Sequence, residues 1–258
     1  MPIIEANWPE FIADDGSEIR AFCTTRLPVS AIKAGNTHHE DSFASFNMGL
    51  HVEDNPSVVQ DNRAQLLSYC GLDNAQWLNQ VHGVDCIRSG EQADVTADAC
   101  WTDKEDLACI VMTADCLPVV FRQAGAVAAA HAGWRGLLNG VLENTLVNFD
   151  RSQVDIWFGP AIGPQAFEVG SEVREQFVAK HAQAVEAFLP SANAGKWLAD
   201  IYQLARITLQ VAGVDPTRIY GGQYCTYSDE QRFYSYRRTA KTGRLATVVY
   251  RTKRNITV

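Results

Sequence analysis

The sequence predicts a single α/β (α+β) domain in which helices flank mixed β-sheets. Short apolar runs bounded by turn residues recur along the 258 residues and indicate strands, whereas only a few segments have helical spacing. Strands and helices alternate irregularly, and several neighbouring strands look connected as hairpins, which favours mixed over all-parallel sheets. No repeat, low-complexity tract or linker-like change of composition interrupts the chain, so residues 1–258 are expected to form one domain.

The elements of the N-terminal part are predicted from the residues that start and stop helices and from hydrophobic periodicity. Asn55-Pro56 starts a helix that stops at Gly71, because Asn caps a helix and Pro suits its first turn. A long loop over 26–48 contains His38 and His39, and adjacent histidines in a polar loop are expected to be solvated. Strands are predicted over 19–25, 76–81 and 84–88.

The rest of the chain is organised around the stretch from Leu107 to Gly136. Here three apolar runs are broken by Thr113-Ala-Asp-Cys-Leu-Pro118 and by His131-Ala-Gly-Trp-Arg-Gly136. Further strands are predicted over 155–158, 218–222 and 246–251, and helices over 137–149, 169–181 and 198–212.

Composition and charge restrict the function classes. The net charge of −8 and the pI near 5.2 argue against a general nucleic-acid binder, but still allow a small anionic substrate. We expect no secretory signal, and no apolar run approaches the ~20 residues that span a bilayer. Seven scattered cysteines without a CxxC pair fit reduced thiols, so we expect a cytoplasmic protein that binds no membrane.

Three chemically reactive side chains follow or end predicted strands, namely His82, Cys116 and His131. One thiolate and two imidazoles suit a borderline-soft ion such as zinc, with a fourth position left open as in catalytic sites. The same residues could instead form a metal-free pair in which Cys116 is the nucleophile and a histidine its base. A third interpretation is a buried cysteine with two structural histidines.

Two neighbours of these residues are also candidates. Asp115 precedes Cys116 and could carry protons if a turn directs it into the site. The segment Gly133-Trp134-Arg135-Gly136 joins a strand to a helix, so its backbone N–H groups and Arg135 could hold an anion. A tight strand–helix turn explains the same glycines equally well. No GxxxxGK[ST] motif is present, so nucleoside triphosphate binding is not indicated.

Several blocks together resemble the signature motifs of the YfiH/laccase-domain family. They are Ser45-Phe-Asn-Met-Gly-Leu50, Asn79-Gln-Val-His-Gly83, Thr113-Ala-Asp-Cys-Leu-Pro118, His131-Ala-Gly-Trp-Arg-Gly136, Gly159-Pro-Ala-Ile-Gly163, Cys225-Thr226 and Ser235-Tyr-Arg-Arg238 with Thr242-Gly-Arg244. They occur in order over nearly the whole chain. One departure is the segment after the first strand, where Arg26-Leu-Pro-Val-Ser30 lacks the two glycines common in the family.

The resemblance implies a single CNF1/YfiH-like domain of the laccase-domain (Cu-oxidase_4) type with a zinc site made by His82, Cys116 and His131. It also implies one of two activities. The older is copper polyphenol oxidase, or laccase. The newer is phosphorolysis of purine nucleosides (adenosine, inosine, guanosine and methylthioadenosine) together with adenosine deaminase activity. A role in editing peptidoglycan precursors has also been proposed for bacterial members.

The histidine count helps to choose between these activities. A blue-copper centre plus a three-copper cluster needs about ten histidine ligands, usually in His-x-His pairs. This chain has six histidines and no His-x-His, so copper is not expected. Purine chemistry needs only an activated water for deamination and a bound phosphate for phosphorolysis.

We therefore expect a zinc-dependent purine nucleoside phosphorylase and adenosine deaminase whose partners are purine nucleosides and phosphate. His82, Cys116 and His131 are its expected catalytic metal ligands, and Asp115 is an expected proton carrier. Asn47 is expected to contact substrate, and Arg135 and Arg237 or Arg238 to bind phosphate. The rival enzyme is a metal-free cysteine hydrolase or amidase acting on a peptidoglycan precursor, and the non-enzyme alternative is a binding protein with a structural metal.

Overall fold

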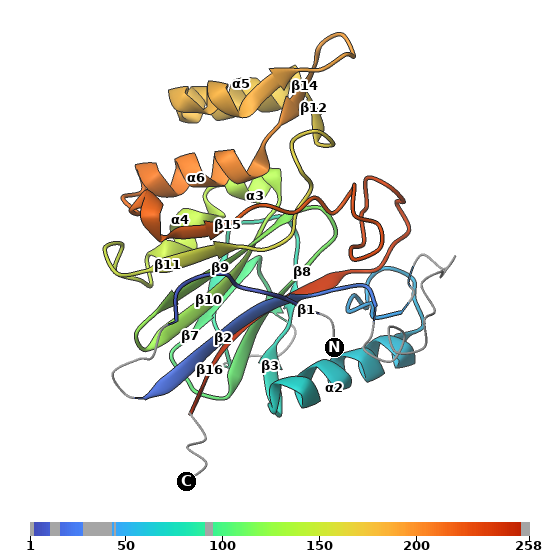
Figure 1. Cartoon of the computed structure of the whole chain (residues 1–258), viewed down its shortest axis with the longest axis vertical. Coiled ribbons are helices and arrows are strands. Elements are labelled where there is room, and N and C mark those ends of the chain that lie inside the picture. The colour runs from blue at the N-terminus through green and yellow to red at the C-terminus, as the bar shows by residue number, and fades with distance from the viewer. Residues whose placement is uncertain (1–2, 11–15, 28–42, 44, 91–94, 254–258) are drawn as a thin grey trace.

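Two β-sheets packed against each other form the centre of this computed structural model, which describes residues 3–10, 16–27, 43, 45–90 and 95–253 (Figure 1). The first sheet has the order β1 (Ile3–Glu5), β2 (Ser17–Thr24), β16 (Leu245–Lys253), β8 (Leu107–Thr113) and β3 (Asn74–Gln76). The second has the order β15 (Ile219–Gly221), β11 (Asp155–Phe158), β9 (Leu117–Gln123), β10 (Ala126–Ala132), β7 (Ala99–Thr102) and β5 (Cys86–Arg88). Both sheets mix parallel and antiparallel neighbours, as predicted.

Apolar side chains between the layers hold the sheets and helices together. Val111 and Val249 of the first sheet share a core with Val120 of the second. Helix α2 (Pro56–Cys70) covers the outer face of the first sheet, where Leu66 joins its core. Helices α3 (Trp134–Asn139), α4 (Val141–Leu146) and α6 (Ile201–Val211) lie on the other side of the second sheet.

Smaller elements complete the arrangement. Helix α5 (Ser171–Lys180) and the sheet of β12 (Glu168–Gly170), β14 (Lys196–Ala199) and β13 (Phe188–Pro190) lie beyond α6, at the top of Figure 1. The remaining elements are the strand pair β4 (Leu78–Asn79) and β6 (Val95–Thr96) and the 3₁₀ helices η1 (Ala182–Ala187) and η2 (Pro216–Arg218).

The prediction was most accurate where local signals agree with packing. Helix α2 begins after Asn55, whose side chain accepts a hydrogen bond from the backbone N–H of Ser57 (3.0 Å). It ends at Gly71, which adopts a left-handed conformation with φ 68°. The strands predicted between residues 107 and 130, and over 155–158 and 246–251, are also confirmed.

Three predicted helices and one predicted strand were wrong in extent. The helix predicted over 137–149 is two helices, because Gly140 has φ 115° and interrupts the α conformation. The helices predicted from residues 169 and 198 each begin later, after strands β12 and β14. The strand predicted over 76–81 is divided because the chain leaves β8 after Gln76 and pairs with β6 over Leu78–Asn79. It ends before Val81, whose backbone N–H donates to the Asp98 carboxylate.

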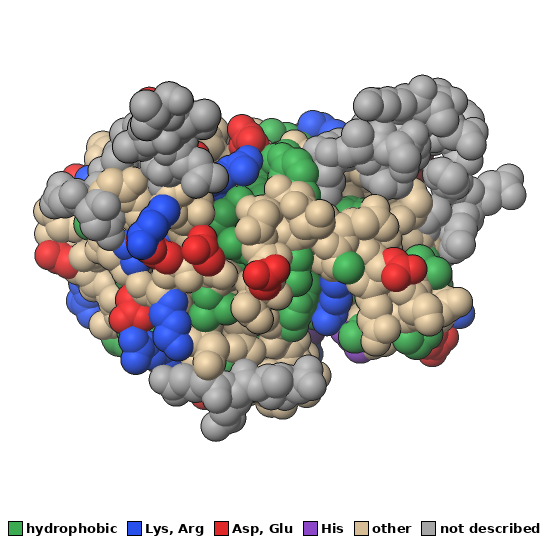
Figure 2. Space-filling view, turned by 90° about the horizontal axis from the view of Figure 1, so that it is seen from below, with side chains coloured by type: hydrophobic (Ala, Val, Ile, Leu, Met, Phe, Trp, Pro, Cys, Tyr) green, Lys and Arg blue, Asp and Glu red, His purple; other side chains and the backbone are tan. Residues whose placement is uncertain are grey.

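The surface carries charges of both signs. Figure 2 shows basic and acidic side chains interspersed on the face seen from below, with apolar side chains between them. None of the described helices is both long and apolar enough to cross a membrane.

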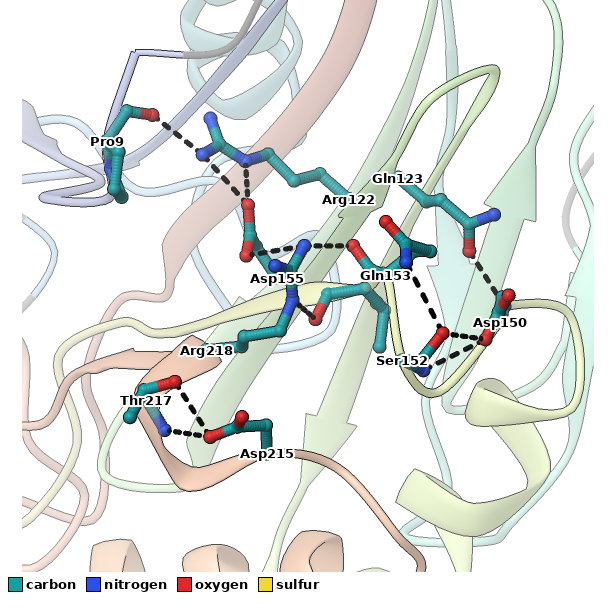
Figure 3. Close-up of polar contacts among 11 residues, drawn as sticks. Pro9, Arg122, Gln123, Asp150, Ser152, Gln153, Asp155, Asp215, Thr217 and Arg218 are labelled. Carbon is teal, nitrogen blue, oxygen red and sulfur yellow. Dashed lines mark hydrogen bonds and ion pairs between the residues drawn. The ribbon is translucent and has the colours of Figure 1, made fainter.

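A buried ion-pair network lies at the end of β9 that is farther from Cys116. Asp155 of β11 pairs with Arg122 of β9 (3.0 Å) and with Arg218 (3.2 Å), and Arg122 also donates to the carbonyl of Pro9 (2.7 Å) (Figure 3). The network ties the N-terminal segment and η2 to the second sheet.

Candidate metal centre and active site

The β9–β10 hairpin brings two of the three predicted ligands together. The strands pair antiparallel, with His131 opposite Pro118 and Ala132 opposite Leu117. Cys116 immediately precedes β9, so this register sets its side chain beside the end of β10 that carries His131.

The third predicted ligand, His82, is held by the carboxylate of Asp98, which lies between β6 and β7. The Asp98 carboxylate accepts hydrogen bonds from the backbone N–H groups of Val81 (3.1 Å), His82 (2.9 Å) and Gly83 (2.6 Å). His82 itself has φ 60°, a left-handed conformation that is rare for a residue with a side chain. The three hydrogen bonds therefore fix His82 in an unusual backbone conformation that turns it toward the hairpin.

Asp98 orients His131 as well. It directly precedes β7, its backbone oxygen accepts from the backbone N–H of His131 (2.7 Å), and its carboxylate lies 2.7 Å from His131 Nδ1. Burial alone would raise the pKa of Asp98, but the hydrogen bonds from His131 and from the backbone hold it below its usual value. Because Nδ1 is engaged, Nε2 of His131 is left for a ligand.

The three donor atoms meet in a small space. They lie within 4.8 Å of one another, and Cys116 Sγ is 3.7 Å from His82 Nε2. In tetrahedral zinc sites, a nitrogen ligand at about 2.0 Å and a sulfur ligand at about 2.3 Å from the ion stand roughly 3.5 Å apart. The donor set and its spacing thus fit one zinc ion with a position left over. In the described part of the chain, this is the one group of three or more side chains close enough to share a metal ion.

The imidazoles favour the deprotonated form of the thiol. Burial alone would raise the pKa of Cys116, but His131 and His82 outweigh it and lower the pKa to about 6. Burial would conversely lower the pKa of His131, but the Cys116 thiolate and Asp98 raise it to about 9. A thiolate is the form that binds metal, so the site is preorganised for it.

The position of Gly133, directly after His131-Ala132, leaves no room for a side chain. A Cβ on Gly133 would lie 2.7 Å from His82 Cδ2 and 3.1 Å from Cys116 Sγ. Gly136 is similarly close to the carbonyl oxygen of Gly83, at 2.8 Å from a would-be Cβ. The two glycines of this block let the start of α3 pack directly against the ligands.

A cavity of about 480 Å³ opens beside the three predicted ligands. Its apolar wall includes Trp134, Ile162, Phe167 and Ile201, with Tyr236 at the exposed side. Its polar lining includes His51, Gln80, Asp115, Arg237 and Arg244. The size lies within the roughly 300–1,000 Å³ typical of small-molecule sites.

Of the residues predicted to bind substrate or phosphate, Arg135 and Asn47 do not line the cavity, whereas Arg237 does. Arg135 is exposed, its guanidinium lies over the Trp134 ring (4.4 Å), and it does not line the cavity. Asn47 is fully buried behind the cavity wall, where its side chain bonds to Gly49, Asp54 and the backbone of Arg244. Arg237 does line the cavity.

Asp115 has φ 94° and a carboxylate that already accepts three hydrogen bonds. It accepts from the hydroxyls of Thr226 (2.6 Å) and Ser235 (3.0 Å) and from the backbone N–H of Arg237 (2.7 Å). These bonds link the Cys116 turn to the segment that carries Tyr236 and Arg237. Arg238 turns away from the cavity and donates to the carbonyls of Thr226, Tyr227 and Phe233.

Sequence reasoning missed Asp98, His51, Gln80 and Arg244 as site residues. Gln80 is held by two hydrogen bonds to the backbone of Met112 (2.7 and 2.8 Å), next to the Cys116 turn. Asp98 directly precedes the strand β7, and nothing in its immediate sequence distinguishes it from any other aspartate that flanks a strand. Arg244 and His51 were within or next to recognised motifs, so motif membership was the one available signal.

A family model described as "Multi-copper polyphenol oxidoreductase laccase" matches residues 29–252. The chain belongs to this YfiH/laccase-domain family. Its relatives include the Pseudomonas aeruginosa protein named purine nucleoside phosphorylase PA4543, which is 51% identical over 248 residues (95% of this chain and 96% of that protein). The Escherichia coli protein named purine nucleoside phosphorylase YfiH is 49% identical over 81% of this chain and 87% of its own length.

Solved structures of the family share the fold. The Neisseria meningitidis protein NMB0706, described as DUF152, superposes with a TM-score of 0.87 at 38% identity, covering 98% of this chain and all of that one. YlmD from Geobacillus stearothermophilus has a TM-score of 0.77 at 28% identity, covering 91% of this chain and 92% of that one. The mixed α+β fold predicted from the resemblance is confirmed.

Proposed function

We propose that this protein is a zinc-dependent purine nucleoside phosphorylase, acting as one YfiH-type domain on adenosine, inosine, guanosine and methylthioadenosine, with adenosine deaminase activity. The observation that carries the proposal is the three-donor centre of His82, Cys116 and His131 at the edge of a cavity. The cavity has an apolar wall and also a cationic wall, the name used here for Arg237 and Arg244. Relatives of about half-identical sequence are named purine nucleoside phosphorylases, which supports the same class of reaction here.

Zinc would be held by Nε2 of His82, Sγ of Cys116 and Nε2 of His131. When bound, it supplies a Lewis acid that stabilises developing negative charge and activates water. The donor set does not suit a multicopper oxidase. Such an enzyme needs about ten histidine ligands, whereas the described residues offer one cluster of three ligands.

The protein's own residues bind and orient the nucleoside. The apolar wall of Phe167, Ile201 and Trp134 suits the flat faces of a purine, and the exposed Tyr236 offers a further aromatic ring at the edge of the cavity. In phosphorolysis, an oxygen of hydrogen phosphate bonds to ribose C1′ as the C1′–N9 bond breaks. The electron pair goes to the purine, and the proton of the hydrogen phosphate ends on the purine nitrogen.

We assign Asp115 a positioning role in place of the proton transfer expected from its sequence position. Its carboxylate accepts three hydrogen bonds, and these anchor the segment of Tyr236 and Arg237 at the rim. We place Arg237 at the rim as a contact for the substrate's polar groups. Its guanidinium also donates to the carbonyls of Ala166 (3.3 Å) and Glu168 (3.1 Å), which hold it in place. Asn47 acts from behind the wall through Arg244.

The test is incubation of the zinc-loaded protein with inosine and phosphate, followed by detection of hypoxanthine and ribose 1-phosphate. Product in phosphate but not in phosphate-free buffer is expected, and Cys116→Ser should abolish it. A second arm with adenosine and no phosphate tests deamination through release of ammonia. Absence of phosphate-dependent product from every nucleoside would contradict the proposal.

One geometric observation favours a second candidate, a metal-free cysteine hydrolase or amidase acting on a peptidoglycan precursor. Cys116, His131 and Asp98 are arranged as a nucleophile, a base and a residue that orients the base. Metal removal distinguishes the two candidates. A stripped protein that keeps full activity until Cys116 is alkylated would establish the hydrolase and exclude the zinc enzyme.

We also propose a cytoplasmic location. All seven cysteines are free in the structure, which fits a reducing compartment.

A further inference from the structure

The cationic wall of the cavity contains a guanidinium without a carboxylate partner. Arg244, directly before β16, is half-buried and lines the cavity. Its Nη1 donates to the carbonyls of Thr242 (2.7 Å) and Gly243 (3.1 Å). Within the described part of the chain, its Nε and Nη2 have no hydrogen-bond partner and no acidic side chain forms an ion pair with it.

The negative charges of Cys116 and Asp115 act favourably on Arg244, but neither of them takes up its two free donor nitrogens, which an anion in the cavity could use. A buried cation keeps little of its hydration, and the cost is recovered when an opposite charge with hydrogen-bond acceptors binds. Burial lowers the pKa of Arg244, but a guanidinium stays charged at any pH at which the protein is folded. The two free donor nitrogens form the planar fork that oxyanions accept in pairs.

The chain fixes Arg244 in place from behind. Asn47 Oδ1 accepts from the backbone N–H of Arg244 (2.8 Å), and the backbone N–H of Met48 donates to the Arg244 carbonyl (3.1 Å). A Cβ on Gly49 would lie 2.8 Å from Arg244 Cγ, so only glycine allows this contact. The Ser45–Leu50 block therefore serves as a seat for Arg244.

His51 extends the same wall. It follows the seat directly, and Arg244, Arg63 and His131 all add to burial in lowering its pKa, so these cations converge on one region. Arg63 does not line the cavity, because it donates to the Met48 carbonyl (2.9 Å) and stacks on Trp77 (3.8 Å). Arg244 and His51 are left facing the cavity that Cys116 also lines.

We propose that Arg244, with a hydrogen bond from His51, binds the inorganic phosphate that attacks the nucleoside. The proposal rests on the phosphorylase function proposed above and names the phosphate subsite within it. It replaces the subsite expected at Arg135, which is exposed and outside the cavity. Phosphate bound there would share the cavity with the apolar side chains that suit the purine.

Direct binding of inorganic phosphate tests the proposal, measured by isothermal titration on metal-stripped and zinc-loaded protein. Arg244→Gln is expected to weaken phosphate binding at least about tenfold, because a charge-assisted fork is lost. Arg244→Lys keeps the charge but not the fork and is expected to lose less. Arg135→Gln is the matched control, an arginine beside the same site that should leave phosphate affinity unchanged. A parallel titration with acetate at equal ionic strength tests whether the site binds a carboxylate more tightly than phosphate.

Steady-state kinetics with inosine separate this inference from the proposed function. Arg244→Gln should raise KM for phosphate at least about tenfold and leave KM for inosine within about twofold. Phosphate-dependent turnover with an unchanged phosphate KM in Arg244→Gln would overturn the inference and leave the function standing. Loss of phosphate binding in Arg244→Gln, without phosphate-dependent turnover in the wild type, would support the anion site and reject the function.

Two further outcomes are decisive. Tighter binding of acetate than of phosphate to the wild type would assign the wall to a carboxylate and overturn the phosphate subsite. If Arg244→Gln does not fold, as judged by its thermal transition, Arg244→Lys and His51→Ala carry the test. Unchanged phosphate affinity in both would reject the inference.

Discussion

Gly133 is the residue at which the site tolerates a side chain least. An added methyl group would meet His82 Cδ2 at 2.7 Å and Cys116 Sγ at 3.1 Å, so Gly133→Ala must displace at least one ligand. We expect zinc affinity to fall at least about tenfold, since changes to residues that merely orient the metal ligands already cost about 10–100-fold. Competition with a chromophoric chelator measures the affinity.

Gly170→Ala is the matched control. Both glycines cap a helix N-terminus with similar backbone angles (φ −62° and −79°), but a methyl group on Gly170 meets only the flexible, exposed Glu172 side chain. Equal zinc affinity in the two variants would show that Gly133 does not shape the site.

Cys116 should react as a thiolate at unusually low pH in metal-stripped protein. Its pKa is lowered to about 6, so the thiolate fraction rises through pH 6 and is nearly complete above about pH 7. The rate of alkylation by iodoacetamide should follow that curve, with Cys116→Ser as the blank for the other cysteines. Zinc should protect the residue. A rate that climbs only above pH 8 would contradict the thiolate–imidazolium arrangement.

At the scale of elements, sequence signals located the strands next to Cys116 and His131 but missed what holds His82 against them. The β9–β10 register follows from two apolar runs and a short turn, so Cys116 and His131 could be paired from sequence. The contact of His82 with them depends on Asp98, which bonds to three backbone N–H groups and to His131. These are long-range contacts of one carboxylate, and no local propensity encodes them.

At the end of β9 farther from Cys116, a substitution can show whether the stability of the fold is separable from zinc binding. Asp155→Asn would leave the buried Arg122 guanidinium and Arg218 without their shared carboxylate (Figure 3). We expect the free energy of unfolding to fall by about 3 kcal/mol, since removing the carboxylate of a buried ion pair leaves the positive charge without its compensation. Urea denaturation measures it.

The same variant should keep zinc affinity. Arg122 lies six residues along an extended strand from Cys116, roughly 20 Å away. Exposed Asp103, which pairs with Arg88 at the surface, provides the control, because Asp103→Asn should cost less than about 1 kcal/mol. Equal losses in the two variants would contradict a special role for the buried network.

At the scale of the whole molecule, the fold class was predictable and the site's boundaries were not. Irregular alternation of short strands and helices indicated mixed sheets, and the histidine count argued against a multicopper enzyme before any geometry was known. Arg244 and Cys116 are 128 positions apart in the sequence, yet they line one cavity because β16 pairs with β8, the strand that leads into the Cys116 turn. Only the assembled sheets show that the cationic wall comes from the far end of the chain.

Removing the metal should therefore weaken the molecule without unfolding it. Three apolar cores hold the sheets and helices, and the ligands come from loops and a strand end at one edge. Binding energy adds stability as RT ln(1 + [L]/Kd), about 4 kcal/mol when zinc is at a thousand times its Kd. We expect chelation to lower Tm by about 5–10 °C while far-ultraviolet circular dichroism at 25 °C stays unchanged. Full unfolding on chelation would mark the centre as structural and favour a binding protein over an enzyme.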